Sequence, residues 1–234
     1  MKRIVALAVA FIICLAALPV FAAGNIRPTD ESAYYVLSHS DGYRVYYYAV
    51  VTNEGDVRAS VNDLLFEIRD RSDTDIESTS KYTLYPEILD PGQSGWLVIT
   101  KDVKDIDDKA YIDHFALTIT TKAADDDKAI RPLASSAEYL EKDEDDNENV
   151  LSATVSNDGK ENAFKITVAM AAHDGEGTLP YIVGDGTKDI GLAPGSALMM
   201  RSNIRSEIMD ELEDEGISVA SAKAMAYTVD DTDD

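Results

Sequence analysis

The sequence predicts an all-β protein built from two tandem antiparallel β-sandwich domains, the second with one short helix. Three observations lead to this fold class. The chain repeats itself at an offset of 104 residues, apolar residues alternate with period two inside each repeat, and Asn-Gly and Pro-Gly turn signals separate the apolar segments. Several short strands over about 100 residues are typical of a two-sheet sandwich.

The repeat is ungapped over residues 33–70, which match residues 137–174. A second block follows with one residue fewer, Leu-Asp-Pro-Gly at 89–92 against Leu-Ala-Pro-Gly at 192–195. Because a duplicated scaffold assigns the shared residues to folding, function is expected where the copies differ. The matched pairs include Ala33/Ala137, Tyr35/Tyr139, Asn53/Asn157, Gly55/Gly159 and Asp70/Asp174.

Alternation places one side of each strand in a core. In the first repeat the predicted inward residues are Val45, Tyr47, Ala49, Val51, Leu64, Phe66 and Ile68. In the second they are Asn149, Leu151, Ala153, Val155, Val168, Met170 and Ala172. Trp96 is predicted to be a core or inter-sheet residue, and further strands are expected over residues 115–121, 197–200 and 220–229.

Turns and one helix complete the expected elements. Residues 51–55 and 155–159 predict a turn whose Asn and Gly tolerate positive φ, and each Pro-Gly pair predicts another. Residues 206–215 predict a short helix with Ser206 as its cap and Gly216 as its stop, and residues 101–109 predict a single turn. The Gly184-Asp185-Gly186 stretch is interpreted as a flexible turn.

The N-terminus predicts a secretory signal over residues 1–22. A charged start precedes an uncharged apolar run at 4–18, and small residues at 20–22 favour cleavage after Ala22, with Ala23 as the alternative. An uncleaved anchor is the other interpretation, although the run is shorter than the roughly 20 residues that span a bilayer. Domains are expected at 23–124 and 133–234, joined by a linker at 125–132. The only cysteine, Cys14, lies in the signal, so the mature chain has neither disulfide nor Cys-ligated zinc.

A motif of the first repeat carries a family resemblance. The strand Phe66-Glu67-Ile68-Arg69-Asp70 follows a Val-x-Asn-x-Gly turn and precedes Leu-x-Pro-Gly. This pattern resembles the FxLYD-like immunoglobulin-type modules of exported bacterial proteins, with arginine where the family has tyrosine. The second copy, residues 170–174, departs further. The resemblance implies two immunoglobulin-like sandwiches in an extracellular, non-enzymatic bacterial protein, and it assigns no site residues.

Charge limits the partners of this acidic chain. It carries 44 acidic against 21 basic residues, a net charge of −23, and shows no basic face, which excludes nucleic acid and anionic lipid surfaces. Stable membrane insertion after signal cleavage is not expected. Calcium is the one cofactor that the sequence leaves open, because carboxylates gather near the expected junction of the domains. The candidate ligands are Asp105, Asp107, Asp108 and Asp125.

No residue pattern predicts catalysis, and the three histidines, His39, His114 and His173, are interpreted as surface residues. The clearest difference between the copies is tyrosine. Tyrosines that face away from the first core can stack on a glycan or pack against an extracellular protein, or lie beneath a loop or the other domain. The candidate binding residues are Tyr34, Tyr43, Tyr46 and Tyr48.

The leading hypothesis is therefore a secreted, non-catalytic bacterial protein that acts in extracellular binding or cell-surface assembly. Two alternatives remain at this point: a calcium-stabilised spacer of the cell envelope, and an extracellular hydrolase built on a pair of carboxylates that the sequence does not single out.

Overall fold

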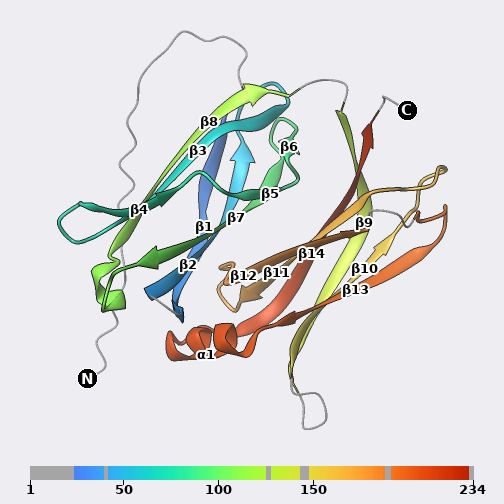
Figure 1. Cartoon of the computed structure of the whole chain (residues 1–234). Helices are drawn as coiled ribbons and strands as arrows, with labels where there is room; N and C mark the ends of the chain where they lie inside the picture. The colour runs from blue at the N-terminus through green and yellow to red at the C-terminus, as the bar shows by residue number, and fades with distance from the viewer. Residues whose placement is uncertain (1–23, 40–41, 125–127, 143–147, 188–190, 232–234) are drawn as a thin grey trace.

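The computed structural model describes residues 24–39, 42–124, 128–142, 148–187 and 191–231, as two β-rich halves lying side by side (Figure 1). The first half runs from β1 to β8 and the second from β9 to β14. The predicted signal segment lies outside the described residues. In the part of the chain that the structure describes, no helix is long and apolar enough to cross a membrane.

Two antiparallel sheets form the first half. Sheet A has the strand order β1-β2-β7-β5, with bounds Ile26–His39, Gly42–Asn53, Ser94–Lys104 and Thr83–Tyr85. Sheet B has the order β4-β3-β6, and β8 also pairs with β3; their bounds are Asp75–Thr79, Ala59–Arg69, Ile88–Leu89 and His114–Ala123. A single 3₁₀ turn, η1 (Lys109–Tyr111), connects β7 to β8.

A continuous ladder of six strands forms the second half, in the order β12-β11-β14-β9-β10-β13. Their bounds are Tyr181–Thr187, Ile166–Asp174, Val219–Asp231, Lys128–Leu140, Asn149–Ser156 and Ala197–Ile204. Strand β9 changes partner midway, because its residues up to Leu133 pair with β14 and those from Ala134 pair with β10. A strand shared in this way turns the ladder into two facing sheets.

The first half has its own hydrophobic core between sheets A and B. All seven inward residues predicted for it are buried in one cluster, together with Leu97 and Ile99 of β7. Because side chains alternate along a strand, Tyr46, Tyr48 and Val50 of β2 point to the opposite face of sheet A. That face does not meet solvent, since these residues belong to the core of the second half.

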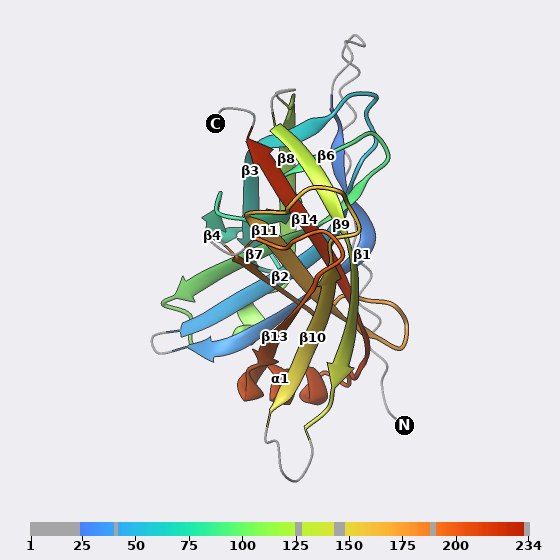
Figure 2. The ribbon, with the colours of Figure 1, turned by 90° about the vertical axis from the view of Figure 1, so that its right-hand side faces the viewer.

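We call this contact between the halves the seam. Its first-half residues are Tyr35, Tyr46, Tyr48, Val50 and Trp96, and its second-half residues include Ala169, Ala171, Tyr181 and Ile182. Sheet A is therefore buried on both faces, and the molecule is a stack of layers. Figure 2 shows β2 and β7 crossing β9 and β14 rather than running along them. Trp96 is buried, as predicted.

Polar contacts also join the halves. Lys109 of η1 forms ion pairs with Glu211, at 2.8 Å, and Glu215, at 3.7 Å. Glu211 belongs to α1 (Ser206–Asp214), the predicted short helix of the second half. The helix begins one residue earlier than expected, because Arg205 rather than Ser206 occupies the N-cap and Ser206 is the first helical residue. Gly216 ends the helix region at φ +75°, as predicted for a glycine stop.

Equivalent hydrogen bonds surround the two matched asparagines. Asn53 is fully buried, and its amide donates to the carbonyl oxygens of Val57 and Leu89 at 2.8 and 2.9 Å. Asn157 is also fully buried and donates to Glu161 and Leu192, both at 2.7 Å. Each side-chain oxygen accepts from the amide N–H two residues later. These asparagines tie each turn to the Leu-x-Pro-Gly segment, where Gly92 and Gly195 adopt φ values of +75° and +74°.

Four local expectations differ from the structure. Residues 128–132, expected in the linker, begin β9, while residues 125–127 lie outside the described part. The turn expected over 101–109 starts only at Lys109, because β7 continues to Lys104. The Gly184-Asp185-Gly186 stretch belongs to strand β12 rather than to a flexible turn. The matched asparagines do not use positive φ; they are buried hydrogen-bonding residues.

Candidate functional site

The predicted tyrosine face is covered by the second half. Tyr46 and Tyr48 are 7% and 2% exposed. The Tyr48 ring meets the Tyr181 ring edge-on, with centroids 6.1 Å apart. The Arg205 guanidinium lies 5.7 Å from the centroid of the Tyr46 ring and donates a hydrogen bond to its hydroxyl. These two tyrosines therefore hold the seam together and offer no platform to an external ligand.

The other two candidates lie on the opposite face of sheet A. The register of β1 and β2 pairs Tyr34 with Tyr47, so both side chains point toward the first core. Tyr34 packs edge-on against Phe115 at 4.5 Å. The Tyr43 hydroxyl donates to the carbonyl oxygen of Asp107 at 3.4 Å. The structure thus divides the four candidate tyrosines between two faces.

The residue that completes the seam is Tyr35, which the comparison of repeats did not single out. It stacks on Tyr46 with centroids 4.9 Å apart, and its hydroxyl lies 3.0 Å from the Tyr48 hydroxyl. Burial raises the pKa of both Tyr35 and Tyr48 well above the ordinary value of 10. Both therefore stay protonated and hydrogen-bonded. The cross-strand register of β1, rather than the repeat, is the signal that identifies Tyr35.

The described acidic residues proposed for calcium, Asp105, Asp107 and Asp108, do not form a metal site. Asp105 is exposed and adopts φ +59°, and Asp108 uses its Oδ1 atom to accept the N–H of Ala110 at the start of η1. Asp107 contributes its backbone oxygen to Tyr43. Among the described residues, no three His, Cys, Asp or Glu side chains come together as a metal site. Asp125 lies outside them.

One histidine is not a surface residue. His173, on β11, is 3% exposed, and its Nδ1 atom lies 3.3 Å from the carbonyl oxygen of Gly177. His173 is therefore buried, and the interpretation of all three histidines as surface residues is wrong for this one. His39 ends β1, and its side chain is not among those described. His114 is partly exposed and belongs to a polar network.

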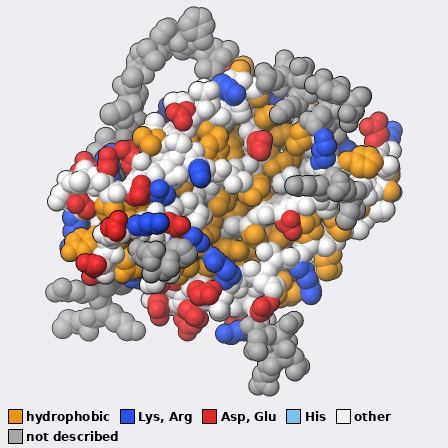
Figure 3. All heavy atoms as spheres, viewed as in Figure 1, with side chains coloured by type: hydrophobic (Ala, Val, Ile, Leu, Met, Phe, Trp, Pro, Cys, Tyr) orange, Lys and Arg blue, Asp and Glu red, His pale blue; other side chains and the backbone are white. Residues whose placement is uncertain are grey.

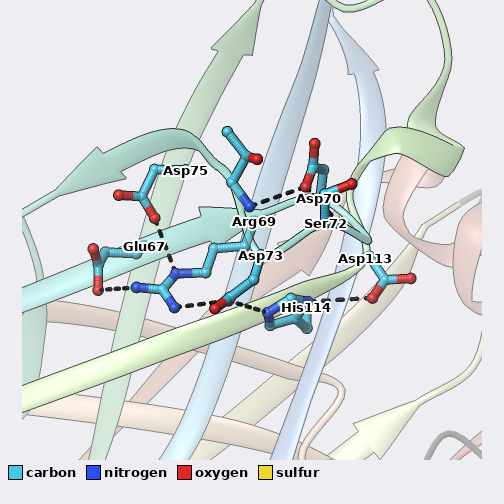
Figure 4. A network of polar contacts seen from close by, with 9 residues as sticks. Glu67, Arg69, Asp70, Ser72, Asp73, Asp75, Asp113 and His114 are labelled. Carbon is cyan, nitrogen blue, oxygen red and sulfur yellow. Dashed lines mark hydrogen bonds and ion pairs between the residues drawn. The ribbon is translucent and has the colours of Figure 1, made fainter.

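This network surrounds Arg69, at the end of β3 (Figure 4). The guanidinium donates to Asp73 at 2.9 Å and to Glu67 at 3.2 Å. Its Nε atom forms an ion pair with Asp75 at 3.0 Å. Arg69 is therefore a cation surrounded by three carboxylates.

Histidine 114 connects the network to β8. Its Nε2 atom lies 3.1 Å from Asp73 Oδ1, and its Nδ1 atom lies 3.2 Å from Asp113 Oδ2. Asp73 therefore contacts two basic side chains, and it adopts φ +62°, which L-residues rarely use. The network holds the β3–β4 turn against the start of β8.

The pKa shifts in this network favour the charged forms. Hydrogen bonds from His114 and Arg69 lower the pKa of Asp73, and the hydrogen bond to Asp73 raises the pKa of Arg69. Both groups therefore remain ionised at neutral pH. The arrangement fixes a salt-bridged turn.

The lowered pKa of Asp73 gives a testable dependence of stability on pH. A carboxyl whose folded-state pKa lies below its ordinary value of 3.8 stabilises the fold above that value and loses this contribution as the pH falls through the folded-state pKa. We expect Asp73→Asn to lower the urea midpoint at pH 7 and to leave it close to wild type below the lowered pKa. The exposed Asp56→Asn is the control. An Asp73→Asn effect of equal size at both pH values would contradict the ionic role.

Hydrogen bonds within the β3–β4 turn also fix its conformation. Asp70 Oδ1 accepts the N–H groups of Ser72 and Thr74 at 2.7 and 3.0 Å. In the second half Asp174 Oδ1 accepts Glu176 and Thr178 at 2.9 and 2.8 Å, in the matching turn. Only the first-half turn has the additional Arg69 network. It is therefore the more strongly fixed of two equivalent turns.

A pocket of about 410 Å³ lies between this fixed turn and η1. We call it the η1 pocket; its lining residues are Asp70, Arg71, Ser72, Asp108, Ala110 and Tyr111. The Tyr111 side chain is 59% exposed, the largest exposure among the described tyrosines. Arg71 forms an ion pair with Asp113 at 3.4 Å. On this side of the molecule Figure 3 shows acidic and basic side chains interleaved with hydrophobic ones.

Comparisons with known proteins add little to this geometry. No protein-family model matches the chain, and no curated protein matches it. Among solved structures, it aligns with the N-terminal CBM22-1–CBM22-2 tandem domain of Paenibacillus barcinonensis Xyn10C over 87% of this chain and 85% of that one, at 9% identity and a TM-score of 0.19. It also aligns with infectious bursal disease virus Gx strain over 93% and 70%, at 8% identity and a TM-score of 0.20. TM-scores this low establish no common fold.

Proposed function

We propose that the chain is an exported, non-catalytic binding protein that engages an extracellular partner through the η1 pocket. Its halves are two tandem immunoglobulin-like units of the FxLYD-like type. The equivalent contacts of Asn53 and Asn157, and of Asp70 and Asp174, support this tandem arrangement. The sequence of the first 22 residues supports export.

The observation that carries the proposal is the exposed ring of Tyr111 beside a turn that is already rigid. An aromatic side chain with an apolar body and a polar tip, set among a few oriented polar groups, is typical of binding sites. The Asp70 side-chain hydrogen bonds and the Arg69 network fix the turn before a ligand arrives. A fixed turn loses little conformational entropy on binding, which favours affinity.

The charge states next to the pocket support binding rather than catalysis. A general acid or base works best with a pKa near the working pH, so that it can take up and release a proton. The pKa of Asp73 is lowered and the pKa of Arg69 is raised, so both pKa values move away from neutral pH. These groups hold the turn in place through permanent charges.

Cosedimentation with cell envelopes tests the proposal. The chain is produced with its own leader, purified, labelled and mixed with intact cells and isolated envelopes of the producing bacterium. We expect wild-type protein to sediment with them and Tyr111→Ala to bind about tenfold more weakly, since loss of one aromatic anchor removes a large part of a small contact.

Phe164→Ala is the matched control, because Phe164 is an aromatic residue with 55% exposure in the second half. It is expected to sediment like wild type. The proposal fails if the wild-type chain does not bind envelopes, or if Tyr111→Ala and Phe164→Ala bind as well as it does.

A further inference from the structure

A second pocket lies between the two halves, away from the η1 pocket. It is an open cleft of about 640 Å³. Its lining residues in the described chain are Tyr85 from β5 of the first half, and Lys165, Ile166, Thr167, Gly184, Asp185, Gly186 and Thr187 around β11 and β12 of the second. Ligand sites occur preferentially between domains, and the volume lies within the range of about 300–1,000 Å³ typical of such sites.

Two glycines of β12, Gly184 and Gly186, line this cleft with backbone atoms and no side chain. The register of β11 and β12 pairs Gly184 with Ala169 and Gly186 with Thr167, so these positions share the face that looks toward the first half. The Tyr85 ring covers Gly184 so closely that a Cβ atom there would overlap it. Glycine inside a strand often marks a close approach by another group. At Gly184 that group is Tyr85.

Gly186 is two residues further along the same face. A Cβ atom there would approach the carbonyl oxygen of Ile166 to 3.1 Å, while none of the nearest described atoms belongs to a side chain of the first half. The backbone over Gly186 therefore remains open beside the Tyr85 ring. A ligand resting there would touch one half through the ring and the other through the strand.

The chemistry of the lining is mixed and close to neutral. Lys165 brings an ammonium group and Asp185 a carboxylate, while Thr167 and Thr187 bring hydroxyls. Asp185 Oδ1 accepts the N–H of Gly186 at 2.7 Å, which holds this carboxylate beside the Gly186 backbone at the edge of the cleft. Because one cation and one anion are present, neither a simple anion nor a simple cation is favoured. A ligand with many hydroxyls can donate to the carboxylate and accept from the ammonium.

We propose that this cleft binds one or two sugar residues of a neutral glycan. The hydroxyls of a sugar match the mixed donors and acceptors, and its C–H face suits the apolar face of the Tyr85 ring. The cleft is open rather than enclosed, so a longer glycan chain passes out of it at either side. The site goes beyond binding at the η1 pocket and does not depend on it.

Calorimetry and thermal unfolding with defined sugars test the inference. The probes are chitohexaose, cellohexaose and maltohexaose, each with its monosaccharide. We expect at least one hexasaccharide to bind and to raise the unfolding temperature, because a ligand that contacts both halves binds only the native seam. A hexasaccharide that binds more tightly than its monosaccharide indicates a polysaccharide as the source, and equal binding indicates a free sugar.

Two variants locate the site. Asp185→Asn keeps an oxygen for the Gly186 N–H but removes the charge, and Thr187→Val removes a hydroxyl at similar volume. Each is expected to weaken binding about tenfold, the effect of losing one good hydrogen bond. Asp63→Asn is the matched control, since Asp63 Oδ1 accepts the next N–H, of Leu64, in the same way on β3. Thr118→Val, at an exposed position of β8, is the second control.

The outcomes separate this site from the η1 pocket. Loss of sugar binding in Asp185→Asn and Thr187→Val, with unchanged unfolding temperatures and unaffected controls, supports the cleft. If no probe binds, or if both variants bind normally, the inference is overturned. Sugar binding that is lost only in Tyr111→Ala would also overturn it, while supporting the proposed function at the η1 pocket.

Discussion

Replacing Tyr48 with alanine is expected to lower the free energy of unfolding by about 3–5 kcal/mol, the range for truncating a large buried aromatic residue. The Tyr48 ring is 2% exposed, contacts Tyr181 of the second half and shares a hydroxyl hydrogen bond with Tyr35. Its removal leaves a cavity in the seam and deprives Tyr35 of a buried partner. Urea unfolding followed by the fluorescence of Trp96, the single tryptophan and itself a seam residue, measures the loss.

Two controls separate packing from hydrogen bonding. Tyr48→Phe keeps the ring and loses one hydroxyl, so we expect a loss of about 1 kcal/mol. Tyr111→Ala removes an exposed ring, and an effect below about 0.5 kcal/mol is expected. If Tyr48→Ala lowered the free energy of unfolding no more than Tyr111→Ala does, the seam would not contribute to the stability of the fold.

The second large effect concerns the matched asparagines. Asn53→Ala removes four side-chain hydrogen bonds, two to carbonyl oxygens and two from the N–H groups of Asn25 and Gly55. Each backbone group that loses its hydrogen-bond partner inside the turn destabilises the fold. We therefore expect the free energy of unfolding to fall by about 3 kcal/mol or more in total. Asn157→Ala is expected to have an effect of similar size, because its contacts are equivalent.

Chemical denaturation of both variants and of Asn62→Ala, at an exposed position of β3, measures this effect. The exposed variant is expected to stay within about 0.5 kcal/mol of wild type. A loss of less than about 1 kcal/mol for Asn53→Ala would show that water or backbone rearrangement replaces the amide, and the role assigned to this residue would be wrong.

Local patterns in the sequence predicted much of the first half. The alternation along residues 45–51 correctly placed Val45, Tyr47 and Ala49 in the core and Tyr46 and Tyr48 on the other face. Turn chemistry correctly placed the glycines at 92, 195 and 216. These signals are local, since the side-chain period and φ preferences depend on a few neighbouring residues.

Which segment packs on the outer face of a sheet depends on contacts between residues far apart in the sequence. Local patterns of side-chain alternation and turn residues do not contain this information. The excess of tyrosine in the first copy suggested a ligand surface, whereas Tyr46 and Tyr48 meet the second half. The small residues Ala169 and Ala171, on the buried strand β11, were the available hint of a close neighbour. The sequence did not predict the η1 pocket, because Tyr111 belongs to no motif and lines the same pocket as Asp70 only in the folded chain.

The two buried faces of sheet A bear on how this chain could be divided. A protein with two repeats suggests two exchangeable modules, each able to be cloned, moved or recombined by itself. Here the middle sheet belongs to both cores, so a cut between the halves would expose a contiguous aromatic patch on one piece and its apolar counterpart on the other. Patches of that kind promote aggregation in water. We therefore expect neither half to stay soluble by itself, although the sequence repeat suggests a boundary between them. Experiments on this protein need a chain that contains both halves.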